Sequence, residues 1–510
     1  MAIKLCLVLA FFVVAISVGA LCRRSAHSVD GFILGGRSVG PWMSAFAFGT
    51  SYFSAVIFVG YAGQFGWKYG LSATWIGIGN ALLGSLLAWI VLGQRTRETT
   101  QRLNTATMPE FFGVRFASRG LRIASAAIIF VFLIPYTASV YNGLSRLFEM
   151  AFGAPYEACV IAMALATCIY VVVGGYMATV VNDFLQGIVM LVGIVAVIAA
   201  VLGDNGGLAA SVQQLAFVPV ESIEKGALTS LFGPNPLDLA GVVVLTSLGT
   251  WGLPQMVQKF YAIDSASAVR KGAVISTLFA IVVAGGSYFL GGFGRLYAEA
   301  VERTASGSIV YDSIVPTMLA GLPDILVGVV VVLVLSASMS TLSSLVLTSS
   351  STLTLDLLKD NVVKSMDERA QIACMRALLV AFIAVSAIIA LVQYHTSLAF
   401  IAQFMSISWG ALAGSFLGPF LWGLYLRRVS KAAVWTSFAL GVGLTCGNML
   451  LGMFGVPWAL SPVNCGALAM LLSLAVVPLV SRFTEPVPAL ADFACEQSDA
   501  PLVERKTQQA

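Results

Sequence analysis

Charged residues are scarce in this chain, and their scarcity excludes most classes of protein. Asp, Glu, Lys and Arg make up only 10% of its 510 residues, against roughly 25% in soluble globular proteins. Hydrophobic residues make up 58%, and the mean hydropathy is +0.91. This composition excludes a soluble enzyme, a nucleic-acid-binding protein and a disordered scaffold. We therefore interpret the chain as a polytopic membrane protein.

Residues that build catalytic and metal sites are also rare. The chain has two histidines, His27 and His395, which are isolated from each other and from any Ser/His/Asp or metal-ligand set. Its eight cysteines include no C-x-x-C pair, so we expect neither a disulfide framework nor a zinc site. No G-x-x-x-x-G-K-[ST] motif occurs, which excludes an ATP-driven pump. We predict that the protein is not an enzyme and needs no organic cofactor.

Long apolar runs are abundant. A membrane crossing needs about 20 apolar residues, and backbone groups in lipid must be satisfied within a helix. The sequence predicts an all-α protein with about 13 transmembrane helices, at 2–21, 40–63, 71–93, 120–147, 156–174, 182–202, 239–258, 272–292, 324–350, 373–393, 397–425, 432–454 and 463–481.

The distribution of Lys and Arg predicts the orientation of these helices. With the N-terminus outside, 22 of the 28 basic residues fall on the cytoplasmic side, Lys259 among them, as the positive-inside rule requires. The predicted location is the cytoplasmic (inner) membrane, with the C-terminus in the cytoplasm. Residues 1–21 could instead be a cleaved signal peptide, but Arg23 and Arg24 directly after the run favour a retained helix.

Two segments contain helix-breaking residues at matching positions. Gly49 lies nine residues into segment 40–63, and Gly249 lies ten residues into segment 239–258, where Pro254 follows. Glycine alone could serve close packing. Matched interruptions in two halves, each starting a set of five helices, are typical of a transporter with an inverted repeat.

This interpretation divides the chain into six parts. They are an extra helix with a cytoplasmic loop (1–39), a first repeat (40–202), an extracytoplasmic loop (203–238), a second repeat (239–425), two C-terminal helices (426–481) and a cytoplasmic tail (482–510).

The ninth segment carries a stripe of small and hydroxyl side chains. Ala337, Ser340, Thr341 and Ser344 share one helix face by their i, i+3, i+4, i+7 spacing. Neutral oxygens can replace the water shell of sodium and still release the ion, although serine and threonine can also simply join helices. Asp183, at the start of another apolar helix, is a candidate functional acid, or a residue wetted at the interface.

At these residues the sequence resembles the sodium:solute symporter family. The matching stretches are Gly35–Ser38, Gly174–Tyr176 through Asn182, Asp183 and Gln186, the Met339–Thr341 helix ending near Asp356, and Trp409–Pro419. They occur in order from about 30 to 430. The branch resembles the proline and pantothenate permeases, and Ser51–Ser54, Trp67–Leu71 and Pro155–Glu157 are especially similar to the pantothenate carriers.

The resemblance implies a leucine-transporter-type 5+5 core and specific ion ligands. One sodium ion would bind the main-chain carbonyls of Thr50, Phe53 and Ala337 and the hydroxyls of Ser340 and Thr341. A second sodium site, found in some members, would use Asp183 with Ser340, Ser343 and Ser344. The solute would contact residues of the broken helices and of the fourth and eleventh segments: Tyr52, Ser54, Tyr136, Thr137, Thr246, Thr250, Trp251, Pro254 and Gln403.

The function that follows is Na+-coupled symport of a small organic solute into the cell by alternating access. Where the proline carriers have an aspartate, this chain has Tyr52, so a carboxylate such as pantothenate fits better than a zwitterion such as proline. A proton-coupled carrier of the same fold and a solute-sensing membrane receptor stay open as alternatives. The expected partners are the solute, Na+ and the lipid bilayer, with no nucleic acid and no obligate protein partner.

Overall fold

The computed structural model describes residues 1–22, 27–219, 224–304, 306–359, 362–363, 365–396 and 401–487. Nearly all regular structure in this part of the chain is helical. The α-helices are α1 (Ala2–Cys22), α2 (Val29–Leu34), α3 (Pro41–Tyr52), α4 (Ala62–Tyr69), α5 (Thr74–Gly79), α6 (Gln94–Arg102), α7 (Met108–Arg115), α8 (Arg119–Phe152), α9 (Tyr156–Asp204), α10 (Leu208–Phe217), α11 (Pro236–Gly252), α12 (Pro254–Tyr261), α13 (Ala266–Ala280), α14 (Gly286–Gly291), α15 (Ile314–Ala320), α16 (Asp324–Thr352), α17 (Glu368–Thr396), α18 (Ile401–Tyr425), α19 (Lys431–Met453) and α20 (Pro462–Ser481).

Short 3₁₀ and π segments extend or join these helices. The 3₁₀ segments are η2 (Gly35–Arg37), η4 (Gly70–Ala73), η7 (Ala227–Thr229), η9 (Gly294–Tyr297) and η10 (Tyr311–Ser313), and the π segments are η3 (Val56–Tyr61), η5 (Asn80–Leu87), η6 (Trp89–Gly93), η8 (Ile281–Gly285) and η11 (Leu353–Leu358). A two-residue antiparallel pair, β1 (Val429–Ser430) with β2 (Pro486–Val487), joins the loop before α19 to the chain after α20.

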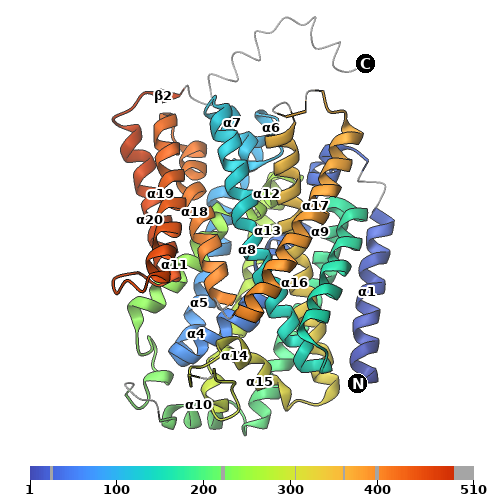
Figure 1. The fold of residues 1–510 in the computed structure, drawn as a ribbon, viewed down its shortest axis with the longest axis vertical. Helices are drawn as coiled ribbons and strands as arrows, with labels where there is room; N and C mark the ends of the chain where they lie inside the picture. The colour runs from blue at the N-terminus through green and yellow to red at the C-terminus, as the bar shows by residue number, and fades with distance from the viewer. Residues whose placement is uncertain are drawn as a thin grey trace, which may run out of the picture.

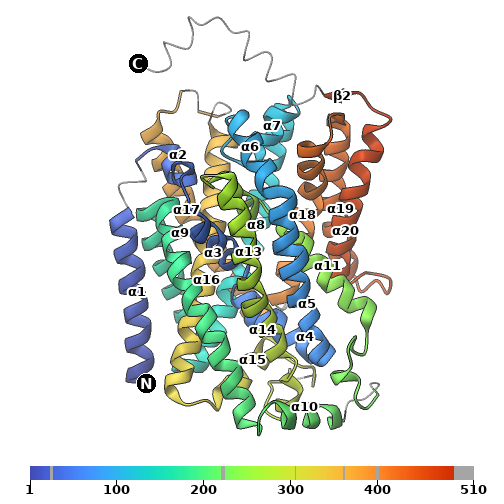
Figure 2. The ribbon, with the colours of Figure 1, turned by 180° about the vertical axis from the view of Figure 1, so that it is seen from behind.

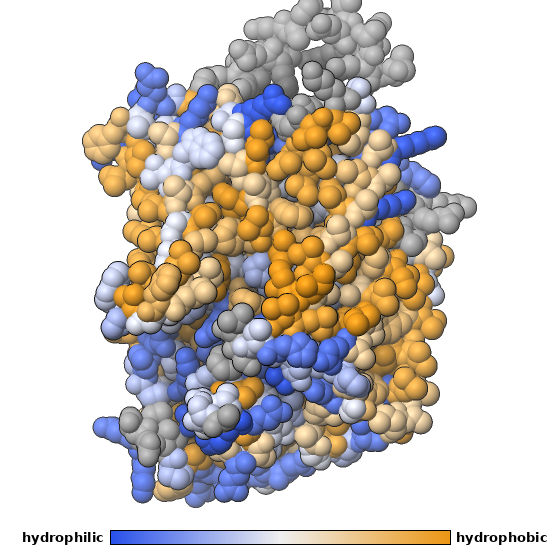
Figure 3. Space-filling model, viewed as in Figure 1, coloured by the Kyte–Doolittle hydropathy of each residue, from blue (hydrophilic) through white to orange (hydrophobic). Residues whose placement is uncertain are grey.

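The molecule is a multi-pass membrane protein. Within the described residues ten helices are long and apolar enough to cross a membrane, and the pair α11 and α12, bent by 46°, gives an eleventh span. Figure 3 shows an apolar belt between hydrophilic rims at the two ends of the molecule. The exposed Leu, Ile and Val residues of these helices lie on this belt, where they would contact lipid rather than water.

The helices are arranged around a central group that contains α3, α8 and α16. α1 lies at one edge, against α9 and α16, and α19 and α20 lie at the opposite edge, against α18 (Figures 1 and 2). α16 is enclosed by other helices over its second half, where every residue from Ser336 to Thr352 is buried. Its serine and threonine hydroxyls therefore face other helices rather than lipid.

The two predicted interruptions are present, but each lies four residues beyond its glycine. α3 ends at Tyr52, and Phe53 has an extended ψ of 117°; α11 ends at Gly252, and Leu253 has a ψ of 124°. Gly49 and Gly249 are instead inside their helices. A Cβ atom on Gly249 would lie 2.3 Å from the ring of Trp409, and one on Gly49 would lie 2.5 Å from Phe279. Both glycines thus allow an aromatic ring to pack against a broken helix.

Candidate functional site

A group of oxygen atoms converges where α16 passes the end of α3. The Thr341 hydroxyl lies 3.1 Å from the carbonyl oxygen of Ala337, 3.4 Å from that of Thr50 and 3.3 Å from that of Phe53. The Ser340 hydroxyl donates to Thr50 Oγ1 over 2.8 Å. α3 stops at Tyr52, so the carbonyls of its last turn lack their usual helical partners. All five residues are fully buried.

These oxygens suit a monovalent, hard cation. The group combines main-chain carbonyls with two hydroxyls and contains no carboxylate, which favours reversible binding of an ion such as sodium. The structure therefore brings together all five residues predicted for the first sodium site.

The serines predicted for a second sodium ion continue along α16 by about one helical turn beyond the first site. A lysine side chain contacts residues of this predicted second site. Asp183 on α9 is fully buried, and its Oδ2 is 3.6 Å from Lys259 Nζ. Lys259 Nζ also donates to Ser344 Oγ over 3.0 Å. Ser343 donates to the Ser340 carbonyl over 2.8 Å.

The placement of Lys259 on a cytoplasmic surface was wrong. Its side chain is only 3% exposed, because α12 continues inside the protein after the break at Leu253. An acid inside a membrane protein is usually paired. The intramembrane Asp183 could therefore have pointed to a basic partner in the sequence.

Aromatic side chains pack against the second broken helix. Tyr136 on α8 meets Trp409 on α18 edge to face, with ring centroids 5.9 Å apart. Trp409 in turn lies against Gly249 of α11. Both rings are fully buried, and the Trp409 indole N–H faces the Tyr136 hydroxyl oxygen. Apart from each other, neither group has a hydrogen-bond partner within the described part of the chain, so the Tyr136 O–H has no acceptor there. Buried donors without partners are rare in proteins unless a ligand or water completes them.

Several other predicted wall residues bond to neighbouring helices. Thr250 Oγ1 lies 2.7 Å from the carbonyl of Gly84, and Trp251 Nε1 donates to that of Leu83 over 2.9 Å, both in η5. Hydroxyls also bond within their own helices or cap the next one: Thr137 to Leu133 O, Thr246 to Val242 O, and Ser54 as the acceptor for Val56 N. Tyr52 and Pro254 are buried and flank the two breaks.

Gln403 lies apart from the Tyr136–Trp409 pair, beside a small cavity of about 90 Å³. Lys68 and Asp238 also line this cavity.

Two residues with suitable chemistry are absent from the predicted walls. Trp409 is one of them. The other is Gln255, which follows Pro254 at the start of α12 and is 1% exposed, with neither end of its amide bonded among the residues described. Its position directly after the helix-breaking proline was the sequence signal for it.

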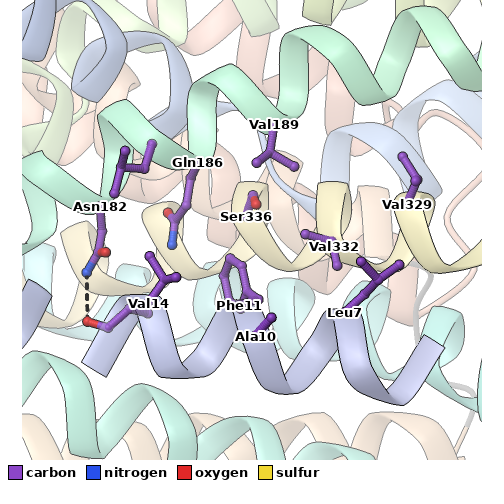
Figure 4. A pocket seen from close by; sticks show the side chains of 12 residues that line it. Leu7, Ala10, Phe11, Val14, Asn182, Gln186, Val189, Val329, Val332 and Ser336 are labelled. Carbon is purple, nitrogen blue, oxygen red and sulfur yellow. Dashed lines mark hydrogen bonds between the residues drawn. The ribbon is translucent and has the colours of Figure 1, made fainter. Parts of the chain in front are cut away.

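A separate cavity of about 360 Å³ lies between α1, α9 and α16, as Figure 4 shows. Leu7 and Phe11 line it from α1, Gln186 from α9 and Ser336 from α16. None of the predicted wall residues borders it. It is therefore distinct from the region around Tyr136 and Trp409.

Buried carboxylates make polar contacts at both ends of the central helices. At one end, Arg122 of α8 pairs with Asp356 of η11 over 2.7 Å. At the other, Asp312 of η10 accepts a hydrogen bond from the Ile401 main-chain N–H over 3.2 Å at the start of α18. Burial raises the pKa of the Asp312 carboxyl to about 6, against the opposing effects of that hydrogen bond and of Arg146.

Known proteins are similar to this chain in sequence and in fold. The model of the sodium:solute symporter family matches residues 32–441. A sodium/proline symporter of Salmonella typhimurium is 32% identical over 437 residues, which cover 79% of this chain and 84% of the relative. A sodium/pantothenate symporter of Escherichia coli is 27% identical over 434 residues, covering 84% and 86%.

A solved structure of a Na+-coupled sialic acid symporter, in a substrate-bound outward-open state, has the same fold. It superposes with a TM-score of 0.77 at 14% identity and covers 95% of this chain and 98% of its own. Together with the oxygen cluster between α3 and α16, these matches identify a sodium-coupled symporter rather than an enzyme. The chain belongs to the sodium:solute symporter family.

Proposed function

We propose that this protein couples the entry of sodium to the uptake of a small organic solute, a carboxylate such as pantothenate or another monocarboxylate, or an amino acid such as proline. The observation that carries this proposal is the meeting of the Thr341 hydroxyl with the carbonyls of Thr50, Phe53 and Ala337. These oxygens come from two different helices, α3 and α16. A cation bound to both would hold the broken helix against α16.

We further propose thirteen transmembrane helices in the inner membrane, with the N-terminus outside and the C-terminus in the cytoplasm. Ten of these thirteen are the long spans described above. The other three are the bent pair α11–α12, the short apolar helix Tyr156–Ile169 and the broken segment that begins with α3. Gly175, with φ of +57°, separates the two halves of α9. The tail beyond 487 lies outside the described residues.

The matched breaks support a 5+5 inverted repeat over 40–202 and 239–425. Each repeat opens with a helix that breaks four residues after a glycine packed on an aromatic ring. Residues 1–39 precede the first repeat, 203–238 connect the two, and 426–481 follow the second. Discontinuous helices at equivalent positions of two repeats are where transporters of this design bind ion and solute.

The proposed cycle is alternating access. Sodium binds between α3 and α16 and favours the outward-open state, the solute completes the site, and both leave on the inside. One charge crossing 100 mV yields about 2.3 kcal/mol, and a tenfold sodium gradient adds about 1.4 kcal/mol. The sum, about 3.7 kcal/mol, can concentrate a neutral solute several hundred-fold.

Buried groups with spare hydrogen-bonding capacity among the described residues support a solute that accepts hydrogen bonds. The Tyr136 hydroxyl and the Trp409 indole N–H are donors, and the Gln255 amide stands at the N-terminal end of α12. A carboxylate suits such donors and the positive end of a helix dipole. Proline and pantothenate, for which two relatives are named, both carry a carboxylate, so we place the solute in this class.

Thermal unfolding of the detergent-purified protein tests this function. The solutes are pantothenate, proline, lactate, acetate, sialic acid and glucose, each with sodium or potassium as the sole salt. A solute at a hundred times its Kd stabilises the native state by about 2.7 kcal/mol. We expect one carboxylate solute to raise the unfolding temperature in sodium only. An equal shift in both salts that grows as pH falls would instead support proton coupling.

A further inference from the structure

Lys259 places a positive charge inside the predicted second sodium site. Its ammonium nitrogen lies 3.0 Å from Ser344 Oγ and 3.6 Å from Asp183 Oδ2. It also lies 5.2 Å from the centroid of the Tyr176 ring, a cation–π distance. The lysine side chain is 3% exposed and the Asp183 side chain is fully buried. Three separate elements, α9, α12 and α16, therefore hold this ion pair out of contact with solvent.

The ammonium group competes for the same ligands as a sodium ion. Both are compact monovalent cations that need oxygen atoms around them, and lysine presents three N–H donors to such atoms. Ser344 Oγ, one of the four predicted sodium ligands, is shared between Lys259 and Ser51 Oγ, each 3.0 Å away. The lysine nitrogen therefore contacts Ser344 Oγ and Asp183 Oδ2, two of the oxygen atoms that a second ion would need.

The charge balance of the site also favours a single cation. Among the described residues, Asp183 is the carboxylate that forms an ion pair with Lys259. One carboxylate neutralises one cation, and a sodium ion added beside the ammonium would leave an uncompensated positive charge in a buried place. Repulsion between two such charges is strong where water is excluded.

The first sodium site is free of this conflict. Of its five residues, four contribute oxygens that contact neither Lys259 nor Asp183 among the described residues: Thr50, Phe53, Ala337 and Thr341. Ser340 is the residue common to both predicted sites. Its hydroxyl donates to Thr50 Oγ1 over 2.8 Å and also lies within hydrogen-bonding range of the Asp183 carboxylate.

We propose that Lys259 is a tethered cation that takes the place of the second sodium ion, so that the protein binds and transports one sodium ion per cycle through the site between α3 and α16. This inference rests on the proposed sodium coupling and sets its stoichiometry. Lys259 and Asp183 then stabilise the α9–α12–α16 contact in the absence of a second ion. Because the lysine is never released, the pair contributes nothing to the driving force.

Equilibrium binding of ²²Na⁺ to the purified full-length protein tests this proposal without a known solute. We expect the wild type to saturate at one sodium ion per chain with a Hill coefficient near 1. Thr341→Ala should weaken this binding at least tenfold, while Asp183→Asn should leave saturation at one ion. Wild-type saturation at two ions would overturn the proposal. Failure of the wild type to bind any sodium would instead overturn the sodium coupling itself.

Variants at Lys259 separate its charge from its size. Lys259→Met keeps a long side chain, removes the charge and frees Asp183, and should raise saturation to two ions with a Hill coefficient above 1. Lys259→Met with Asp183→Asn should return saturation to one ion, and Lys259→Arg should stay at one. Saturation at one ion in a folded Lys259→Met protein would contradict the proposal. If that variant does not fold, the wild-type and Asp183→Asn stoichiometries decide.

Discussion

The Thr341 hydroxyl lies 3.3 Å from the carbonyl oxygen of Phe53, the residue at which the first broken helix leaves helical geometry. The contact joins α16 to the end of α3 across 288 positions of sequence. The Thr341 hydroxyl also lies near the carbonyl of Thr50, in the last turn of α3, where the helix ends and its carbonyls lack helical partners. Such a group of oxygen atoms is suitable for binding a cation. The geometry therefore links the helix break directly to the proposed ion site.

Removing the two hydroxyls of this site should raise the sodium requirement steeply. Each hydrogen-bonding or ligand contact with a charged group contributes about 1.5–3 kcal/mol. Ser340→Ala with Thr341→Ala should therefore raise the sodium concentration for half-maximal uptake in proteoliposomes by at least about tenfold. Ser350→Ala is the matched control, since Ser350 is a buried α16 serine whose hydroxyl, among the described residues, bonds only to the Leu347 carbonyl of its own helix. Unchanged sodium dependence in the double variant would reject the site.

Tyr136→Phe should weaken solute binding without weakening the fold. Within the described chain the Tyr136 O–H has no acceptor, and its oxygen meets only the Trp409 indole N–H, so removing the hydroxyl breaks little protein contact. If the hydroxyl donates to a solute carboxylate, about 1.5–3 kcal/mol of binding energy is lost. We expect roughly a tenfold or greater rise in the KM for uptake and an unchanged unfolding temperature without solute.

Tyr61→Phe provides the opposite pattern as a control. The Tyr61 hydroxyl lies 2.7 Å from Ser406 Oγ in the packed interior, so this variant should lower the unfolding temperature. A KM for Tyr136→Phe equal to that of the wild type would remove Tyr136 from the solute site.

Gly249→Ala should disturb the packing around the second broken helix. The new Cβ atom would lie 2.3 Å from Trp409, which is itself fully buried and in contact with Tyr136. Overpacking of this kind costs about 1–3 kcal/mol. We expect a lower unfolding temperature in detergent and reduced uptake.

Gly443→Ala on α19 is the matched control for Gly249→Ala. No atom lies within 4 Å of its new Cβ, so this variant should leave stability equal or slightly higher. Equal unfolding temperatures for the two variants would show that Trp409 can move aside.

Stability should rise as pH falls through the titration of Asp312. Its pKa is raised to about 6 by burial, above the ordinary value of 3.8, so the native state binds this proton more tightly than the unfolded state does. The stabilisation is complete below about pH 4 and is lost as pH rises through 6. A rise of the pKa from 3.8 to about 6 corresponds to about 3 kcal/mol of unfolding free energy at low pH.

Unfolding of the wild type and Asp312→Asn between pH 4.5 and 7.5 measures this contribution. The amide cannot titrate, so the difference in unfolding free energy between the two proteins should change with pH, most steeply below pH 6, and level off above pH 7. A difference that stays constant with pH would show that the carboxyl titrates normally.

The sequence by itself determined the class of protein and predicted where candidate ion ligands lie along the chain. Apolar runs of about 20 residues allow only membrane helices, and the spacing of Ala337, Ser340, Thr341 and Ser344 already places them on one face of a helix. The interruptions near Gly49 and Gly249 were predicted because glycine and proline act through the local backbone. Each of these inferences depends on a few neighbouring residues.

Only the tertiary structure decided which distant side chains meet. Lys259 follows a helix break, and its burial depends on the direction in which α12 continues after Leu253, which local sequence does not fix. Its pairing with Asp183 and Ser344, the packing of Trp409 against Gly249, and the contacts of Thr250 and Trp251 with η5 all join residues at least 76 positions apart. Such contacts depend on how whole helices pack, and packing is a property of shape rather than of local residue pattern.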